Sequence, residues 1–151
     1  MSAKNPVLLG LAFAAGLFIA ACGSVSAPAE EAPATLKPVA GSSVHQVQLS
    51  AVAAHRLGIE TRAVRMAAGA DSGHPGTHKV IPYSAVVYDT DGSTWTYVES
   101  AARTFVRDRI TVAGIDGPTA VLTRGPAPGA RVVTVGAPEL LGAEYDISGE
   151  E

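Results

Sequence analysis

The chain has 151 residues, enough for one compact domain with a tether and too few for two ordinary domains. Its 11 Lys and Arg residues against 14 Asp and Glu residues give a formal net charge of −3. This balance provides no broad basic surface, so nucleic acid is excluded as an expected partner.

The first 21 residues have the order of an export signal. Lys4 is followed by an apolar run over residues 7–19, which is too short to cross a bilayer as a helix. The run ends in Ala20-Ala21-Cys22, which resembles a bacterial lipobox. We therefore expect residues 1–21 to be removed and Cys22, the only cysteine, to carry a covalent lipid that anchors the protein to a membrane. An unpaired thiol and an intermolecular disulfide are the alternatives for Cys22.

Residues 22–43 are rich in Ala, Pro, Ser and Glu and contain few side chains that could enter a core. This composition predicts a disordered, semi-extended tether between the membrane and a folded domain. We expect the folded domain over residues 44–145 and a disordered tail over residues 146–151.

The domain begins with residues 44–49, where apolar and polar side chains alternate with the period of a half-buried strand. A short helix is expected over residues 51–57, because Ser50 can cap its start and Gly58 suits the left-handed position that ends helices. Strand-like character then returns over residues 59–64.

Residues 65–79 contain three glycines, one proline and few large apolar side chains, which predicts an exposed loop. Beyond it, residues 80–88 and 94–98 are rich in β-branched and aromatic side chains and are separated by an Asp-Thr-Asp-Gly turn sequence. This pattern predicts a hairpin. Trp95 and Tyr97 would share one face of its second strand, with core packing favoured over an exposed recognition patch.

A second pair of strands is expected between residues 104–112 and 119–123, joined by a Gly- and Pro-containing turn. Alternation would place Arg107 and Arg109 together on one face, either in solvent or paired with acids. The opposite face, which begins at Val106, would then point toward the core.

Residues 131–135 have the composition of a last strand, and residues 138–142 that of a short helical turn. Several short strands joined by Gly and Pro turns predict an all-β, mainly antiparallel fold. The expected architecture is a small rolled barrel or sandwich with one or two short helices. Such a fold does not by itself specify a function.

Several stretches resemble, in the same order, the membrane-proximal domain of the periplasmic adaptor subunits of RND efflux pumps, which are also called membrane fusion proteins. They are residues 47–50, 57–61, 81–88, 95–98, 105–112, 124–133 and 140–143. Full adaptors place a barrel, a lipoyl-like module and usually an α-helical hairpin between the second and third of these stretches. Here only residues 65–79 remain, so the chain resembles a membrane-proximal domain standing alone.

This resemblance implies an accessory or truncated adaptor component of an efflux transporter, held at the membrane with its domain facing the periplasm or extracytoplasmic space. The implied partner is an RND-type or ABC-type transporter subunit, or another adaptor chain. Arg103, Arg107 and Arg109 are the candidate contact residues if they lie on one rim. The alternative is a lipoprotein of the cell envelope that binds a small molecule or a metal ion.

Two histidines provide the only metal-site pattern. His74 and His78 have a spacing that could close around zinc, with Asp71 nearby. Two solvated loop histidines are the favoured interpretation, because metal sites usually need a third protein ligand. Met66 is the only methionine outside the export signal and the initiator, which disfavours soft-metal handling.

No motif of a catalytic family is present, and acylation would leave no cysteine as a nucleophile. Ser84, His78 and Asp89 can be drawn as a triad, but such residue sets are common in any chain. Asp89 and Asp91 are better explained as turn formers than as a carboxylate pair. We therefore expect a protein that is not an enzyme and has no cofactor beyond the lipid on Cys22.

Overall fold

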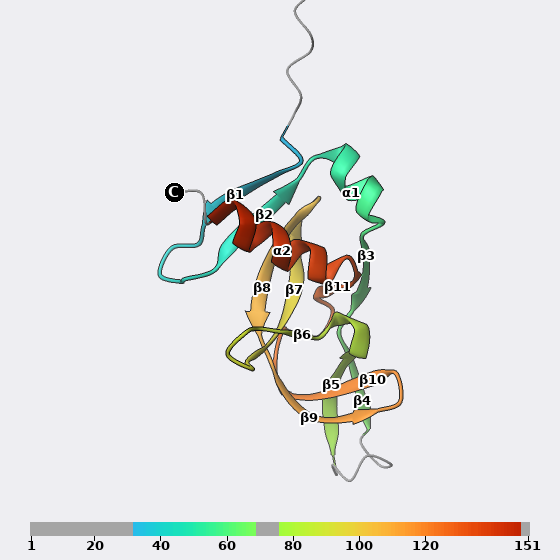
Figure 1. The fold of residues 1–151 in the computed structure, drawn as a ribbon. Helices are drawn as coiled ribbons and strands as arrows, with labels where there is room; N and C mark the ends of the chain where they lie inside the picture. Colours follow the sequence, from blue (N-terminus) through green and yellow to red (C-terminus); the bar gives the residue numbers. More distant parts are fainter. Residues whose placement is uncertain (1–31, 69–75, 149–151) are drawn as a thin grey trace, which may run out of the picture. The chain divides into compact units, whose positions relative to one another are not determined.

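The computed structural model describes residues 32–68 and 76–148 (Figure 1). The export signal, Cys22, Asp71, His74 and residues 149–151 lie outside this part of the chain. The elements in chain order are β1 (Ala34–Pro38), β2 (His45–Leu49), α1 (Ala51–Leu57), β3 (Glu60–Ala63), β4 (Arg65–Ala68), β5 (Thr77–Pro82), the 3₁₀ turn η1 (Tyr83–Ala85), β6 (Val87–Tyr88), β7 (Thr94–Ala101), β8 (Thr104–Arg109), β9 (Thr111–Asp116), β10 (Thr119–Arg124), β11 (Arg131–Val135) and α2 (Ala137–Ser148).

The strands form two antiparallel sheets, which confirms the predicted all-β class with two short helices. The larger sheet has the order β1-β2-β8-β7-β11-β3, with β6 paired to β7, and the smaller has the order β4-β5-β10-β9. The sheets do not close into a barrel, so the sandwich alternative holds. Within the larger sheet Val47 lies opposite Phe105, and Thr61 lies opposite Val133. The early segment and the late segment therefore share one sheet.

Two strands pass from one sheet to the other through a single buried residue. Val64 separates β3 from β4, and Ile110 separates β8 from β9; both side chains are buried. They belong to a core cluster that also contains Ile81, Leu122 and Val132. The prediction of one strand over 104–112 was therefore wrong, because the chain bends at Ile110 to bury that side chain between the sheets.

Helix α1 confirms the prediction for residues 51–57. The Ser50 hydroxyl accepts the Ala53 N–H at 3.1 Å, and Gly58 has the left-handed φ of 61°. Helix α2 lies across one face of the larger sheet (Figure 1) and packs on β1, β2 and β7. Val47, Tyr97 and Leu140 meet beneath it in a second core cluster.

Three segments predicted to be irregular are ordered. The expected tether contains β1, in which Leu36 lies opposite Val47 and covers the core cluster beneath α2. The expected loop over 65–79 contains β4 and the start of β5, which pair with each other. The expected tail begins inside α2, which continues to Ser148. In each case strand pairing or helix packing orders a segment whose own sequence only weakly favours a strand or helix.

The predicted strand over 80–88 is also divided. β5 ends at Pro82, η1 follows, and β6 then joins the larger sheet by pairing Val87 with Trp95. Only the last part of this segment forms the predicted hairpin. Pro82 has no N–H to donate to a continuing ladder, which is consistent with the break.

Candidate functional site

Helix α2 places one acidic side chain against the sheet. Gly136 precedes the helix with a φ of 88°, and Pro138 falls in the first turn, where a missing N–H costs no helical hydrogen bond. Leu140 and Glu144 are four residues apart and therefore face the same side. Both are buried, and Glu144 is only 2% exposed.

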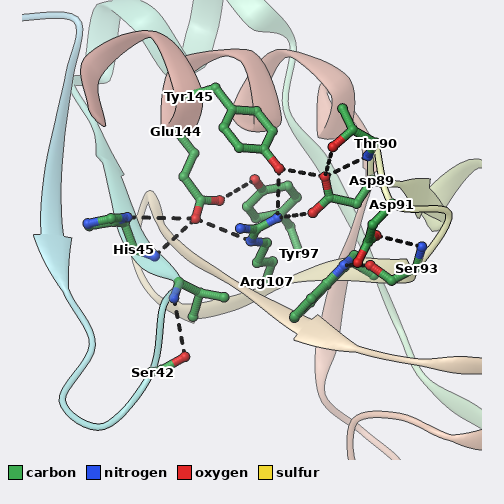
Figure 2. A network of polar contacts seen from close by, with 12 residues as sticks. Ser42, His45, Asp89, Thr90, Asp91, Ser93, Tyr97, Arg107, Glu144 and Tyr145 are labelled. Carbon is green, nitrogen blue, oxygen red and sulfur yellow. Dashed lines mark hydrogen bonds and ion pairs between the residues drawn. The ribbon is translucent and has the colours of Figure 1, made fainter. Parts of the chain in front are cut away.

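Glu144 receives contacts from three strands (Figure 2). Its Oε2 accepts the Tyr97 hydroxyl of β7 at 2.7 Å, and its Oε1 accepts the His45 backbone N–H of β2 at 3.0 Å. Arg107 Nε of β8 lies 3.2 Å from Oε1. The Nε–H is not directed at the carboxylate, so this last contact is an ion pair without a hydrogen bond.

Arg107 joins Glu144 to the turn between β6 and β7. Its side chain is 9% exposed, and Nη1 donates to Asp89 Oδ2 at 2.7 Å. The guanidinium also lies 4.8 Å from the centroid of the Trp95 ring and 5.6 Å from that of Tyr145. We call Asp89, Tyr97, Arg107, Glu144 and Tyr145 the ionic cluster.

Asp89 completes the ionic cluster from the hairpin turn. Its Oδ1 accepts the Tyr145 hydroxyl at 2.5 Å and the Thr90 N–H at 2.7 Å. The hydrogen bond from Tyr145, followed by those from Thr90 and Arg107, lowers the pKa of Asp89. The same contact with the Asp89 carboxylate raises the pKa of Tyr145.

Burial and the hydrogen bond to Glu144 raise the pKa of Tyr97 well above its ordinary value of 10. Burial alone would lower the pKa of Arg107, but the hydrogen bond to Tyr145 and the attraction of Glu144 give a net rise. Tyr97 therefore stays neutral and Arg107 stays positively charged across the physiological pH range. The ionic cluster is suited to fastening α2 to the sheet, because each of its charges has an opposite charge or a hydrogen-bond donor beside it.

The three candidate contact arginines do not form one rim. Arg107 and Arg109 share a face of β8, as expected, and both guanidiniums lie over the Trp95 ring. Helix α2 covers that face at Arg107, whereas Val106 on the other face is only half-buried and Asp108 is exposed. The predicted core face is therefore wrong within β8, but it is right for Ile110, which is buried, and for Val112, which packs against the same core cluster. Arg103 lies in the turn before β8, at the opposite end of the strand from Arg109.

Trp95 and Tyr97 differ in burial. Tyr97 is fully buried, in agreement with the expected core packing. Trp95 is half-buried, donates its Nε1–H to the Ser93 hydroxyl at 2.7 Å, and provides the ring beneath the arginines.

Among the described residues, the remaining candidates lie on separate elements. Ser84 lies in η1 and His78 in β5, while Asp89 is held by Arg107 and Tyr145. Within residues 32–68 and 76–148, no three His, Cys, Asp or Glu side chains come together as metal ligands. Asp89 and Asp91 accept backbone N–H groups of the hairpin turn, as turn formers should.

Sequence reasoning missed Glu144 and Tyr145. A helix extended through residue 148 would have placed Glu144 on the Leu140 face and so indicated a buried acid, which requires a basic or hydrogen-bonding partner. No helix in the described residues is long and apolar enough to span a membrane. Comparison with protein-family models, with curated proteins and with solved structures gave no match.

Proposed function

We propose that this protein is a lipid-anchored component of an efflux transporter, in which the β domain docks on the extracytoplasmic face of an RND-type transporter. The observation that carries the proposal is the closure of two separated segments into one sheet, β2 beside β8 and β3 beside β11. These segments contain the stretches that resemble the two parts of an adaptor's membrane-proximal domain. If the partner is an ABC-type transporter or another adaptor chain, the same β domain would dock on it.

The short connection between the segments supports a free-standing domain. Ala68 of β4 lies opposite Thr77 of β5, so the two ends that must be joined are already adjacent. Closure entropy changes by only about 0.6 kcal/mol per doubling of loop length, and replacing large inserted modules with residues 69–76 is therefore thermodynamically acceptable. A domain without those modules cannot form a sealed conduit by itself, so we assign it a docking role.

The ionic cluster supports docking by fixing α2. Glu144 ties the helix to β2, β7 and β8, and Tyr145 ties it to the β6–β7 turn. A helix held in this way presents a preorganised surface, which lowers the entropy cost of binding a partner.

Co-purification of the full chain tests the proposal. The protein, tagged at its C-terminus and expressed at its natural level, is cross-linked in intact cells, extracted in mild detergent and recovered with its partners. We expect subunits of an export transporter, identified by mass spectrometry. Cys22→Ser should lose both acyl-chain incorporation and partner recovery while keeping the folded domain. A strictly monomeric chain without a transporter partner would contradict the proposal.

A further inference from the structure

A depression of about 540 Å³ lies beside α1 on the helix-covered face of the larger sheet. Its volume is within the range of small-ligand sites. Its sides come from α1, β3, β7, β8, β11 and the β7–β8 turn. Its polar lining consists of Thr61, the acids Glu60 and Glu99, and the arginines Arg62, Arg103 and Arg131.

Strand alternation explains why these side chains meet. Glu99 is two residues from Tyr97, and Arg131 is two residues from Val133, so each shares the face of a core residue beneath the helices. Glu99 lies opposite Phe105 across the β7–β8 pair. The charged groups therefore border the same surface as the apolar core, at a place that the helices leave open.

Arg131 is already oriented. Its Nε donates to Glu99 Oε2 at 3.1 Å, and its Nη2 donates to Thr61 Oγ1. With these contacts the Arg131 side chain is still 59% exposed, and its guanidinium has further N–H donors available. A guanidinium fixed in this way loses little entropy when it binds an anion.

Arg103, at the edge of the depression, has a strained backbone conformation. It has a φ of 55°, and it is the only non-glycine residue with a positive φ in the described part of the chain. Glycine adopts this conformation without strain, whereas a bulky residue does not. The Arg103 carbonyl accepts the Leu49 N–H at 2.9 Å, a bond that glycine would preserve. Fold alone therefore does not require an arginine side chain at this position.

The Arg103 guanidinium has no hydrogen bond or ion pair within residues 32–68 and 76–148. It borders the depression together with Arg62 and Arg131, and the two acids there, Glu60 and Glu99, leave one positive charge in excess. Arg103 thus combines a strained backbone with an exposed guanidinium that has no partner among the described residues, and backbone strain of this kind is concentrated at functional sites.

We infer that the depression binds a phosphate group, held between Arg103 and Arg131. Two guanidiniums match the several acceptor oxygens of phosphate. The Thr61 hydroxyl, which accepts from Arg131 and donates to Glu99, holds the Arg131 guanidinium in place. Ile59 and Phe105 provide an apolar wall for the organic part of a phosphate ester. The group can come from free phosphate or from a phospholipid headgroup. This site is independent of the proposed transporter contact.

Calorimetric titration of the full chain in a neutral detergent tests the site with two probes, inorganic phosphate and the headgroup diester glycerophosphoglycerol. Arg103→Gly keeps the left-handed backbone and should weaken binding about tenfold or more. Glu99→Gln should strengthen binding, because it removes the acid that competes for Arg131. Arg124→Ala, an exposed arginine outside the depression, is the matched control and should bind as the parent chain does.

The two probes separate the sources of the phosphate group. Tighter binding of inorganic phosphate indicates a free phosphate ligand, and tighter binding of the diester indicates a lipid headgroup. Thermal unfolding of each variant verifies that the fold is retained. The inference is overturned if neither probe binds, or if Arg103→Gly binds no more weakly than Arg124→Ala.

Discussion

Two arginines four residues apart on one strand and its preceding turn have opposite surroundings. Arg107 lies under α2, is 9% exposed and contacts two acids. Arg103 lies beyond the helix, is exposed and has no side-chain partner in the described residues. The difference shows that α2 brings Arg107 the counter-charge of Glu144, whereas Arg103, outside the helix, keeps an exposed guanidinium.

Removing Glu144, the more buried of the two acids in the ionic cluster, should have the largest effect on stability. Glu144→Ala leaves the buried Arg107 with Asp89 as its remaining counter-charge and removes the acceptor of the Tyr97 hydroxyl. Removing one partner of a buried ion pair costs about 3–5 kcal/mol. Urea denaturation measures the loss. Asp146→Ala, an exposed acid on the same helix, is the control and should change stability by less than about 0.5 kcal/mol. Equal changes in the two variants would show that the ionic cluster does not fasten α2.

Tyr97→Phe should have an intermediate effect. It removes the hydroxyl that donates to Glu144 at 2.7 Å and leaves the packing of the ring unchanged. A hydrogen bond to a charged group contributes about 1.5–3 kcal/mol. Tyr83→Phe is the control, since its half-exposed hydroxyl meets only that of Tyr88, at 3.4 Å. A cost for Tyr97→Phe no larger than that for Tyr83→Phe would contradict the assignment.

Lowering the pH should weaken the ionic cluster, because the Asp89 carboxylate becomes protonated. The pKa of Asp89 is lower in the native state than in the unfolded chain. Its contribution to the free energy of unfolding is therefore complete above the unfolded pKa of about 3.9. This contribution is lost as the pH falls through the native pKa. Asp89→Asn should therefore be less stable than the parent chain at neutral pH, by a margin that shrinks below about pH 4. Unfolding free energies measured from pH 7 to pH 2 check this, and a margin independent of pH would contradict it.

Local chemistry explains what the sequence predicted correctly. Ser50 and Gly58 cap a helix through contacts within a few residues, and the Asp-rich turn joins β6 to β7 for the same reason. Alternation also predicted strands over residues 44–49 and 104–109, and the structure pairs these segments as β2 and β8.

Long-range packing explains what the sequence did not predict. Alternation continues unbroken through Ile110, so nothing local marks the change of sheet. Arg107 and Arg109 were expected in solvent or paired with acids, and Arg107 is paired with Asp89 and Glu144, whereas Arg109 is exposed. The alternation of β8 could not indicate that α2 covers Arg107, because this helix begins only at Ala137. β1 has only two inward residues, Ala34 and Leu36, between prolines, and acquires its structure by pairing with β2.

The most direct test of the separation between structural and ligand-binding cations is a side-by-side urea denaturation of Arg107→Met and Arg103→Gly. Methionine keeps much of the apolar stem but leaves Glu144 and Asp89 without their cation, so we expect a loss of about 3 kcal/mol. Glycine relieves the left-handed strain, so Arg103→Gly should stay within about 0.5 kcal/mol of the parent chain or exceed it. Comparable losses in both variants, or a larger loss for Arg103→Gly, would contradict the account.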